Sequence, residues 1–173
     1  MTSATDILID GFGRIREVVH RVVATHSPQV LAERVDSDAN SIAWLVWHLT
    51  RVQDDHVSEV AGTEQVWLSE GWNTRFGLPF PPEATGYAQS SDEVGLVQGI
   101  SAELLRGYHD AVHAQTVGFV EGLSDDDLAR IVDERWTPAV TLAVRLVSVI
   151  SDDLQHAGQA AFIAGMLGRR RHG

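Results

Sequence analysis

The chain has 173 residues, the size of one domain, and 44% of them are hydrophobic, enough to build a core. Its formal net charge is −11, and all 13 basic residues are arginine, so the charge argues against nucleic acid as a partner. The absence of cysteine excludes disulfides, thiolate metal sites and a thiol nucleophile borne by the protein itself. We expect one domain over residues 1–173.

The N-terminus and the lengths of the apolar runs bear on the cellular location of the protein. The N-terminus has neither the basic nor the apolar region of a secretory signal. No segment offers 18 uncharged apolar residues, so no transmembrane helix is expected. We therefore expect a cytoplasmic protein with no membrane partner.

Apolar periodicity predicts four helices. The first covers about residues 4–25 and is stopped near Pro28. The second covers about 40–61, with Asn40 or Ser41 as N-cap and Gly62 at its end. The third covers about 91–122; Ser90 or Ser91 with Glu93 marks its start and Gly122 its end. The fourth covers about 139–167, with Pro138 near its first turn and Gly168 after it. No segment shows convincing strand alternation.

Four such helices predict an all-α fold, a four-helix bundle. The second connection, Thr63 to Gln89, is long enough to run back along a helix, so the second and third helices can lie parallel in an up-down-down-up order. The connection is rich in aromatic residues and proline, which argues against a disordered linker. We expect it to pack over the bundle and wall a pocket.

The segment 139–167 carries a polar stripe along one side. At 100° per residue, Arg145, Ser148, His156 and Gln159 all lie within about 40° of Asp152. Periodicity alone favours the solvent face for such a stripe. The stripe is nevertheless flanked by Val144, Val149, Phe162 and Ile163, which favours an inward position. An inward stripe leaves the apolar back of this helix to be covered, by a second copy in a homodimer or by neighbouring helices.

Asp152 and His156 are four residues apart, so on a helix they are neighbours on one face. With one more imidazole they would form a three-ligand set for a divalent metal, and three ligands leave coordination positions open for chemistry. His48, in the apolar run WLVWHLT, is the candidate third ligand. A histidine in such a setting is more often a core residue whose polar atoms are satisfied. An unpaired buried carboxylate is costly, however, and a shared ion would satisfy all three groups.

Other polar groups offer rival interpretations. His109 and His113 have the same spacing on the third helix, but no matching third ligand stands out. Asp55 lies two turns from His48 and could support it, although the end of that helix, with Asp54, His56 and Glu59, also fits a solvated face. The run Ser124–Asp127 fits an N-cap with an acidic first turn and lacks the features of a calcium loop.

Two segments resemble the DinB-like superfamily. SIAWLVWHLTRVQDDH resembles its second helix, where a histidine binds metal, and SDDLQHAGQAAF resembles its fourth, which reads HxxxHxGQ or begins with an acidic residue. The resemblance extends over essentially the whole chain and implies His48, Asp152 and His156 as metal ligands. Zinc is the expected ion, with nickel, manganese or iron as alternatives because aspartate is a harder ligand than histidine. Candidates for supporting the ligands or binding substrate are Arg145, Gln159, Asp55 and Trp44.

The His–acid–His set resembles that of the mycothiol-dependent enzymes of actinobacteria, which include maleylpyruvate isomerase, and the lysine-free composition suits such a source. The chain is too short to carry the C-terminal domain of that isomerase, so its exact activity is not expected. The resemblance implies a metal-dependent thiol S-transferase acting on mycothiol and an electrophile, with Arg145 holding an anionic group or pairing with Asp152. The alternatives are a metal-dependent hydrolase and a non-catalytic module that binds metal or a small ligand.

Overall fold

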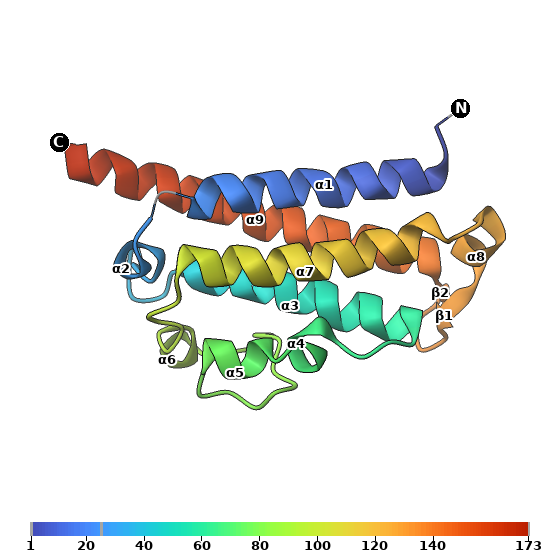
Figure 1. Ribbon diagram of the computed structural model, residues 1–173, viewed down its shortest axis with the longest axis horizontal. Coiled ribbons are helices and arrows are strands. Elements are labelled where there is room, and N and C mark those ends of the chain that lie inside the picture. Colours follow the sequence, from blue (N-terminus) through green and yellow to red (C-terminus); the bar gives the residue numbers. More distant parts are fainter. Residues whose placement is uncertain (1, 25, 173) are drawn as a thin grey trace.

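The computed structural model describes residues 2–24 and 26–172, with no side-chain description at 171 and 172 (Figure 1). Four long helices form the body: α1 (Ala4–Val23), α3 (Ile42–Ala61), α7 (Ala102–Glu121) and α9 (Leu142–His172). Shorter elements join them: α2 (Pro28–Leu31), α4 (Val66–Ser69), α5 (Trp72–Phe76), α6 (Ser91–Val94), α8 (Asp125–Ala129), β1 (Ile131–Asp133) and β2 (Val140–Thr141). The expected helical bundle is confirmed, with a small antiparallel hairpin of β1 and β2 added to it.

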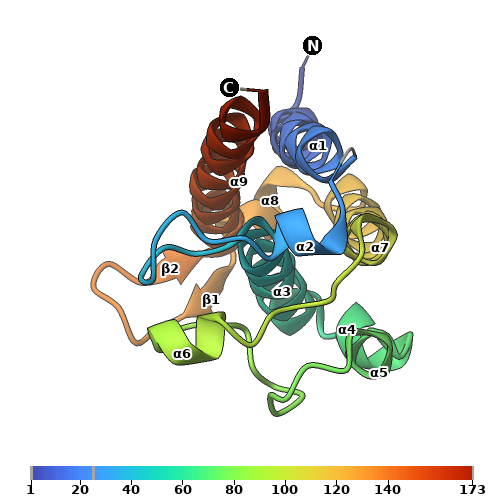
Figure 2. The same ribbon diagram turned by 90° about the vertical axis from the view of Figure 1, so that its left-hand side faces the viewer.

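The long helices pack around one hydrophobic core. α3 packs against α7 and α9, and α1 packs against the same two helices, so α1 and α3 lie diagonally across the bundle (Figure 2). In Figure 1 the colours show α3 and α7 running in one direction and α1 and α9 in the other. None of the helices in the described part of the chain combines the length and hydropathy needed to cross a membrane.

Several helix ends lie where the sequence predicts them. The Ser41 hydroxyl accepts a hydrogen bond from the backbone N–H of Trp44 and caps α3. Gly62 closes the same helix in the left-handed conformation, with φ of 69°. Ser124 caps α8, as its acidic first turn suggests. These ends follow from side-chain and backbone chemistry close to them in sequence, which is why the sequence is enough to locate them.

The expected third and fourth helices need correction. Ser90 and Glu93 do form a capping box, but it opens the short helix α6, and α7 begins only after Ser101. Gly99, with φ of 74°, lies in the loop between the two helices. Pro138 is in the hairpin turn before α9, and α9 continues through Gly168 rather than ending there.

The connection between α3 and α7 is fixed to the bundle by a buried polar network. The Asp54 carboxylate accepts hydrogen bonds from the backbone N–H groups of Val66 and Trp67 and from the Tyr108 hydroxyl. Arg51, which is fully buried, donates to the carbonyl oxygen of Ala84. The expectation of a solvated end for this helix is therefore wrong for Asp54, which is 1% exposed because the connection covers it. The aromatic connection packs over the bundle, with Trp67, Trp72 and Phe76 buried.

Candidate metal centre

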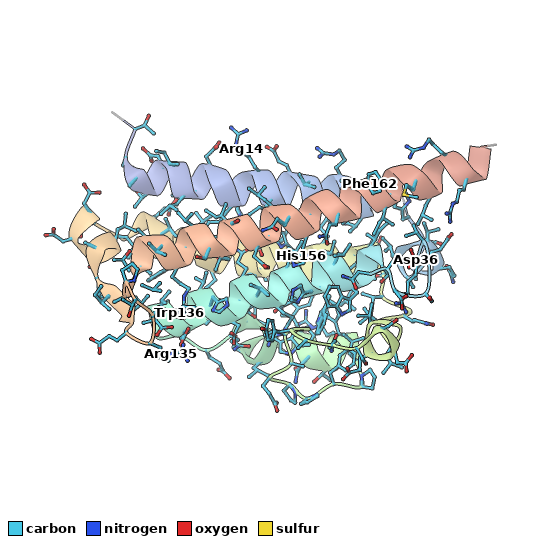
Figure 3. The ribbon with its side chains drawn as sticks, turned by 180° about the vertical axis from the view of Figure 1, so that it is seen from behind. Arg14, Asp36, Arg135, Trp136, His156 and Phe162 are labelled. Carbon is cyan, nitrogen blue, oxygen red and sulfur yellow. The ribbon has the colours of Figure 1, made fainter. Side chains whose placement is uncertain are left out.

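His48 on α3 and Asp152 and His156 on α9 meet where these two helices pack together. One potential ligand atom from each residue lies within 4.8 Å of the other two, and no other such group of three occurs in the described residues. Figure 3 shows His156 on α9 on the side facing α3. Ligand atoms on one zinc ion lie about 3–4 Å apart, so small side-chain rotations bring the three onto a single ion.

His48 is held by the connection that passes over it. It is 6% exposed, and its Nδ1–H donates to the carbonyl oxygen of Thr85 over 2.6 Å, which leaves Nε2 as the atom available to a metal. Gly86 permits this approach: its φ is +94°, and a Cβ there would lie 2.8 Å from Nδ1 of His48. Burial lowers the pKa of His48, so the ring is neutral and able to act as a ligand.

The other two residues interact as a pair one helical turn apart. Nε2 of His156 lies 3.6 Å from Oδ1 of Asp152. The imidazole lowers the pKa of Asp152, and the carboxylate raises the pKa of His156. Nδ1 of His156 lies 3.2 Å from Oε1 of Gln159, so Nδ1–H donates to the amide oxygen and Nε2 is again the nitrogen facing the site.

One oxygen atom of the cluster lacks a hydrogen bond. Oδ2 of Asp152 is buried, and no described residue donates to it. Buried polar oxygens are almost always satisfied, and a carboxylate more so than most. Two imidazole nitrogens and a carboxylate form a donor set suited to zinc and similar ions, and a bound cation would satisfy this oxygen. The residues present therefore fit a divalent metal ion.

Trp44 supports both histidines from the turn of α3 before His48. Its ring stacks on His48 with centroids 4.6 Å apart and planes inclined by 18°, and it meets His156 edge-on at 6.4 Å. Its indole N–H donates to Oε1 of Gln89 over 2.7 Å, which ties the ring to the connection. The stacking restricts the rotation of the His48 ring, so Trp44 orients a candidate ligand.

Two pockets open beside the triad. The loop pocket has a volume of about 470 Å³ and is lined by His48, Val52, Asp55, His56, Thr85, Tyr87 and Asp152. The hairpin pocket, of about 500 Å³, is lined by Val52, His56, Asp133, Arg135, Trp136, Val140, Arg145, Ser148, Val149 and Asp152. Both share Val52, His56 and Asp152, so they meet at the candidate metal centre. Trp136 and Arg135 mark the hairpin at one end of the bundle in Figure 3.

Two of the expected supporting residues have other partners. Arg145 forms ion pairs with Glu59 at 2.7 Å and Asp133 at 3.3 Å, so the pairing with Asp152 considered from the sequence is wrong. Arg145 nevertheless lines the hairpin pocket next to Asp152. Asp55 lines the loop pocket, but its carboxylate accepts from the side-chain amide of Gln65 and has no hydrogen bond to His48.

His109 and His113, the alternative metal-binding pair, lie in a different environment from the candidate metal centre. His109 is fully buried, its Nδ1 lies 3.1 Å from the Thr50 hydroxyl, and burial lowers its pKa to about 3. Its ring centroid is 6.5 Å from that of His113. Among the described residues no third histidine or acidic group joins the pair in a potential ligand set. His109 therefore belongs to the bundle interior beside Thr50 of α3, and His113 is a partly buried residue of α7.

Fold and site together define a helical bundle with a three-residue candidate metal centre between two of its long helices. The family model of the DinB superfamily matches residues 12–160, and the chain belongs to this superfamily. A solved structure described as a conserved protein of locus from Enterococcus faecalis is 28% identical, with a TM-score of 0.88, and the match covers 95% of this chain and 96% of that one. A comparison with curated proteins finds no match to this chain.

The sequence predicts that the connection walls a pocket, but it does not predict the contact of the connection with His48 or the presence of the hairpin. Thr85 and Gly86 have no local signal, because their role depends on a contact with His48, which precedes Thr85 by 37 residues. The polar run around His56 fits a solvated helix end, although a spacing of eight residues from His48 is also compatible with the same side of α3. That spacing was the one available signal for it.

Proposed function

We propose that the protein is a metal-dependent thiol S-transferase. In this proposal His48, Asp152 and His156 hold a divalent ion, with zinc as our expectation, and a low-molecular-weight thiol, with mycothiol as our expectation, reacts there with an electrophile. When bound, such an ion lowers the pKa of a coordinated thiol and so provides thiolate at neutral pH. Membership of the DinB superfamily and the three-residue cluster support this assignment.

The observation that carries the proposal is the pair of pockets that meet at Asp152. Transfer to or from a thiol requires two organic molecules side by side, one on each side of the activating group. The loop pocket and the hairpin pocket, each of about 500 Å³ or slightly less, provide that arrangement, and each is large enough for a small molecule. A hydrolase needs only one organic substrate, with water as the second reactant.

The composition of the chain suits this chemistry. Without cysteine or lysine it offers an electrophile neither a thiol nor a side-chain amine. The residues around the site have defined tasks: Thr85 and Gln159 fix the tautomers of His48 and His156, and Trp44 fixes the plane of His48. Val52 and Thr85 of the connection line the loop pocket.

The test is conjugation of 1-chloro-2,4-dinitrobenzene with mycothiol, with N-acetylcysteine as a second thiol, by zinc-loaded and zinc-free protein. We expect conjugation above the uncatalysed rate with the zinc-loaded wild type, and loss of it after chelation and in Asp152→Asn. Hydrolysis of p-nitrophenyl acetate without thiol conjugation would favour the hydrolase. Tight zinc binding with neither reaction would favour a non-catalytic module.

We also propose a homodimer formed through the outward face of α9. Val147, Leu154 and Phe162 on this face are 56%, 43% and 67% exposed, and packing against a second copy would remove this apolar surface from water. Sedimentation of the wild type and of Leu154→Glu/Phe162→Glu tests this. A dimer that becomes a folded monomer supports it, and a wild-type monomer at high concentration contradicts it.

A further inference from the structure

His56 lies where the pockets around the candidate metal centre come together. Its side chain lines the loop pocket, the hairpin pocket and a third pocket of about 430 Å³ that extends towards Glu59 and Arg145. Among the described residues it is the one side chain common to these three pockets. A group in this position can contact a bound molecule whichever of the pockets the molecule enters.

The tautomer of His56 is set by its neighbour. Nδ1 of His56 lies 3.3 Å from Nη1 of Arg145. A guanidinium has only donors, so Nδ1 accepts and the proton of the neutral ring is on Nε2. Arg145 cannot easily turn away, because Glu59 and Asp133 both pair with it and its side chain is 12% exposed.

The proton on Nε2 has no acceptor among the described residues. Nε2 of His56 forms no hydrogen bond with another described residue, and it is not among the polar atoms shut away from solvent. It is therefore a fixed donor that a molecule in the pockets can reach. Such a donor suits an acceptor oxygen on a ligand, because a ligand without one would leave the N–H unpaired when it displaces water.

His56 lies apart from His48 along α3. His48 and His56 are eight residues apart, about 12 Å along the helix axis, with Val52 between them. His56 is thus too far away to share an ion with His48, and it is not part of the ligand cluster. A molecule of several atoms can contact the metal centre with one end and His56 with the other.

We propose that His56 donates a hydrogen bond from Nε2 to a carbonyl or carboxylate oxygen of the substrate, several atoms away from the group that meets the metal centre. Arg145 is a positioning residue that holds the tautomer. The inference rests on the proposed function only in taking these pockets as the substrate site, and it selects for ligands that carry an acceptor oxygen at this distance.

The first test determines the tautomer of His56 by ¹⁵N NMR of the histidine rings in metal-free protein. We expect the proton of the neutral His56 ring on Nε2 in the wild type and a mixture of tautomers in Arg145→Met. A wild-type ring protonated on Nδ1 would overturn the inference, since Arg145 would then not be the neighbour that sets it.

The second test is calorimetric binding of succinate and butyrate to zinc-loaded protein. Both have a four-carbon chain and one carboxylate for the metal, and only succinate has a second acceptor group. We expect the wild type to prefer succinate. His56→Phe should weaken succinate binding about tenfold and leave butyrate binding unchanged, as expected for one hydrogen bond to a charged group. His56→Gln, which keeps an N–H near the position of Nε2, should retain the preference.

The matched control is His113→Phe, the same substitution on α7, away from these pockets. Equal weakening of both ligands in His56→Phe, an unchanged preference for succinate, or no binding of either ligand to the wild type would overturn the inference. These results do not depend on thiol conjugation. If succinate is preferred through His56 but no conjugation is observed, the proposed function is contradicted and the role of His56 is supported.

Discussion

Gly86→Ala is the substitution whose effect on the metal centre follows most directly from the structure. Gly86 has φ of +94°, a conformation that costs a residue with a side chain about 1–3 kcal/mol. A Cβ there would also lie 2.8 Å from Nδ1 of His48, 3.0 Å from Trp47 and 3.2 Å from Trp44. Since these rings belong to a packed helix, the connection has to move away from them.

Movement of the connection removes the hydrogen bond from His48 to the carbonyl oxygen of Thr85. Loss of a group that orients a metal-binding histidine typically weakens metal affinity about 10–100-fold, and we expect a change of this size for zinc. The measurement is zinc affinity by competition with a chromophoric chelator, together with urea unfolding of the metal-free protein.

Gly71→Ala is the matched control. Gly71 also has a positive φ, +69°, but nothing lies within 4 Å of its Cβ position. Both variants should lose stability through backbone strain, and only Gly86→Ala should lose zinc affinity. Wild-type zinc affinity in Gly86→Ala, or an equal loss in both variants, would refute the reasoning that the connection positions His48.

Three further predictions concern buried charge. Asp54→Ala should lower the free energy of unfolding by about 3–5 kcal/mol in urea, because it leaves the buried Arg51 charge without its carboxylate partner; a loss below about 1 kcal/mol would contradict this. Burial raises the pKa of Asp153 well above its usual range, so the folded protein keeps a proton that the unfolded chain releases, and stability falls as pH rises above the unfolded value of about 4. Asp153→Asn should therefore gain stability relative to wild type between about pH 4 and pH 7 in thermal unfolding, and a pH-independent difference would count against it. Asp152 raises the pKa of His156, so protons compete with the metal; zinc affinity should rise with pH and level off once His156 is neutral in the metal-free protein, whereas affinity independent of pH would argue against His156 as a ligand.

The sequence was sufficient for the parts of the site that depend on helix periodicity. Asp152 and His156 are one turn apart on any helix, so their proximity could be predicted, and the apolar run around His48 located the helix that faces them. The ends of that helix were also predictable, because Ser41 and Gly62 act on backbone groups a few residues away.

The remaining features depend on contacts that periodicity does not contain. The capping box of Ser90 marks a helix start but does not give the length of the helix, so the sequence pattern does not separate the four-residue α6 from α7. Strands of three and two residues are too short to alternate, so the hairpin gave no signal. The true partners of Arg145 include Asp133, which the hairpin brings to it.

The measurement that tests the central claim most directly is the zinc content of purified, dialysed protein. We predict about one ion per chain in the wild type, little in His48→Ala, Asp152→Ala and His156→Ala, and wild-type content in His113→Ala. Full zinc content in Asp152→Ala together with loss in His113→Ala would contradict the assignment of the metal centre to the interface of α3 and α9.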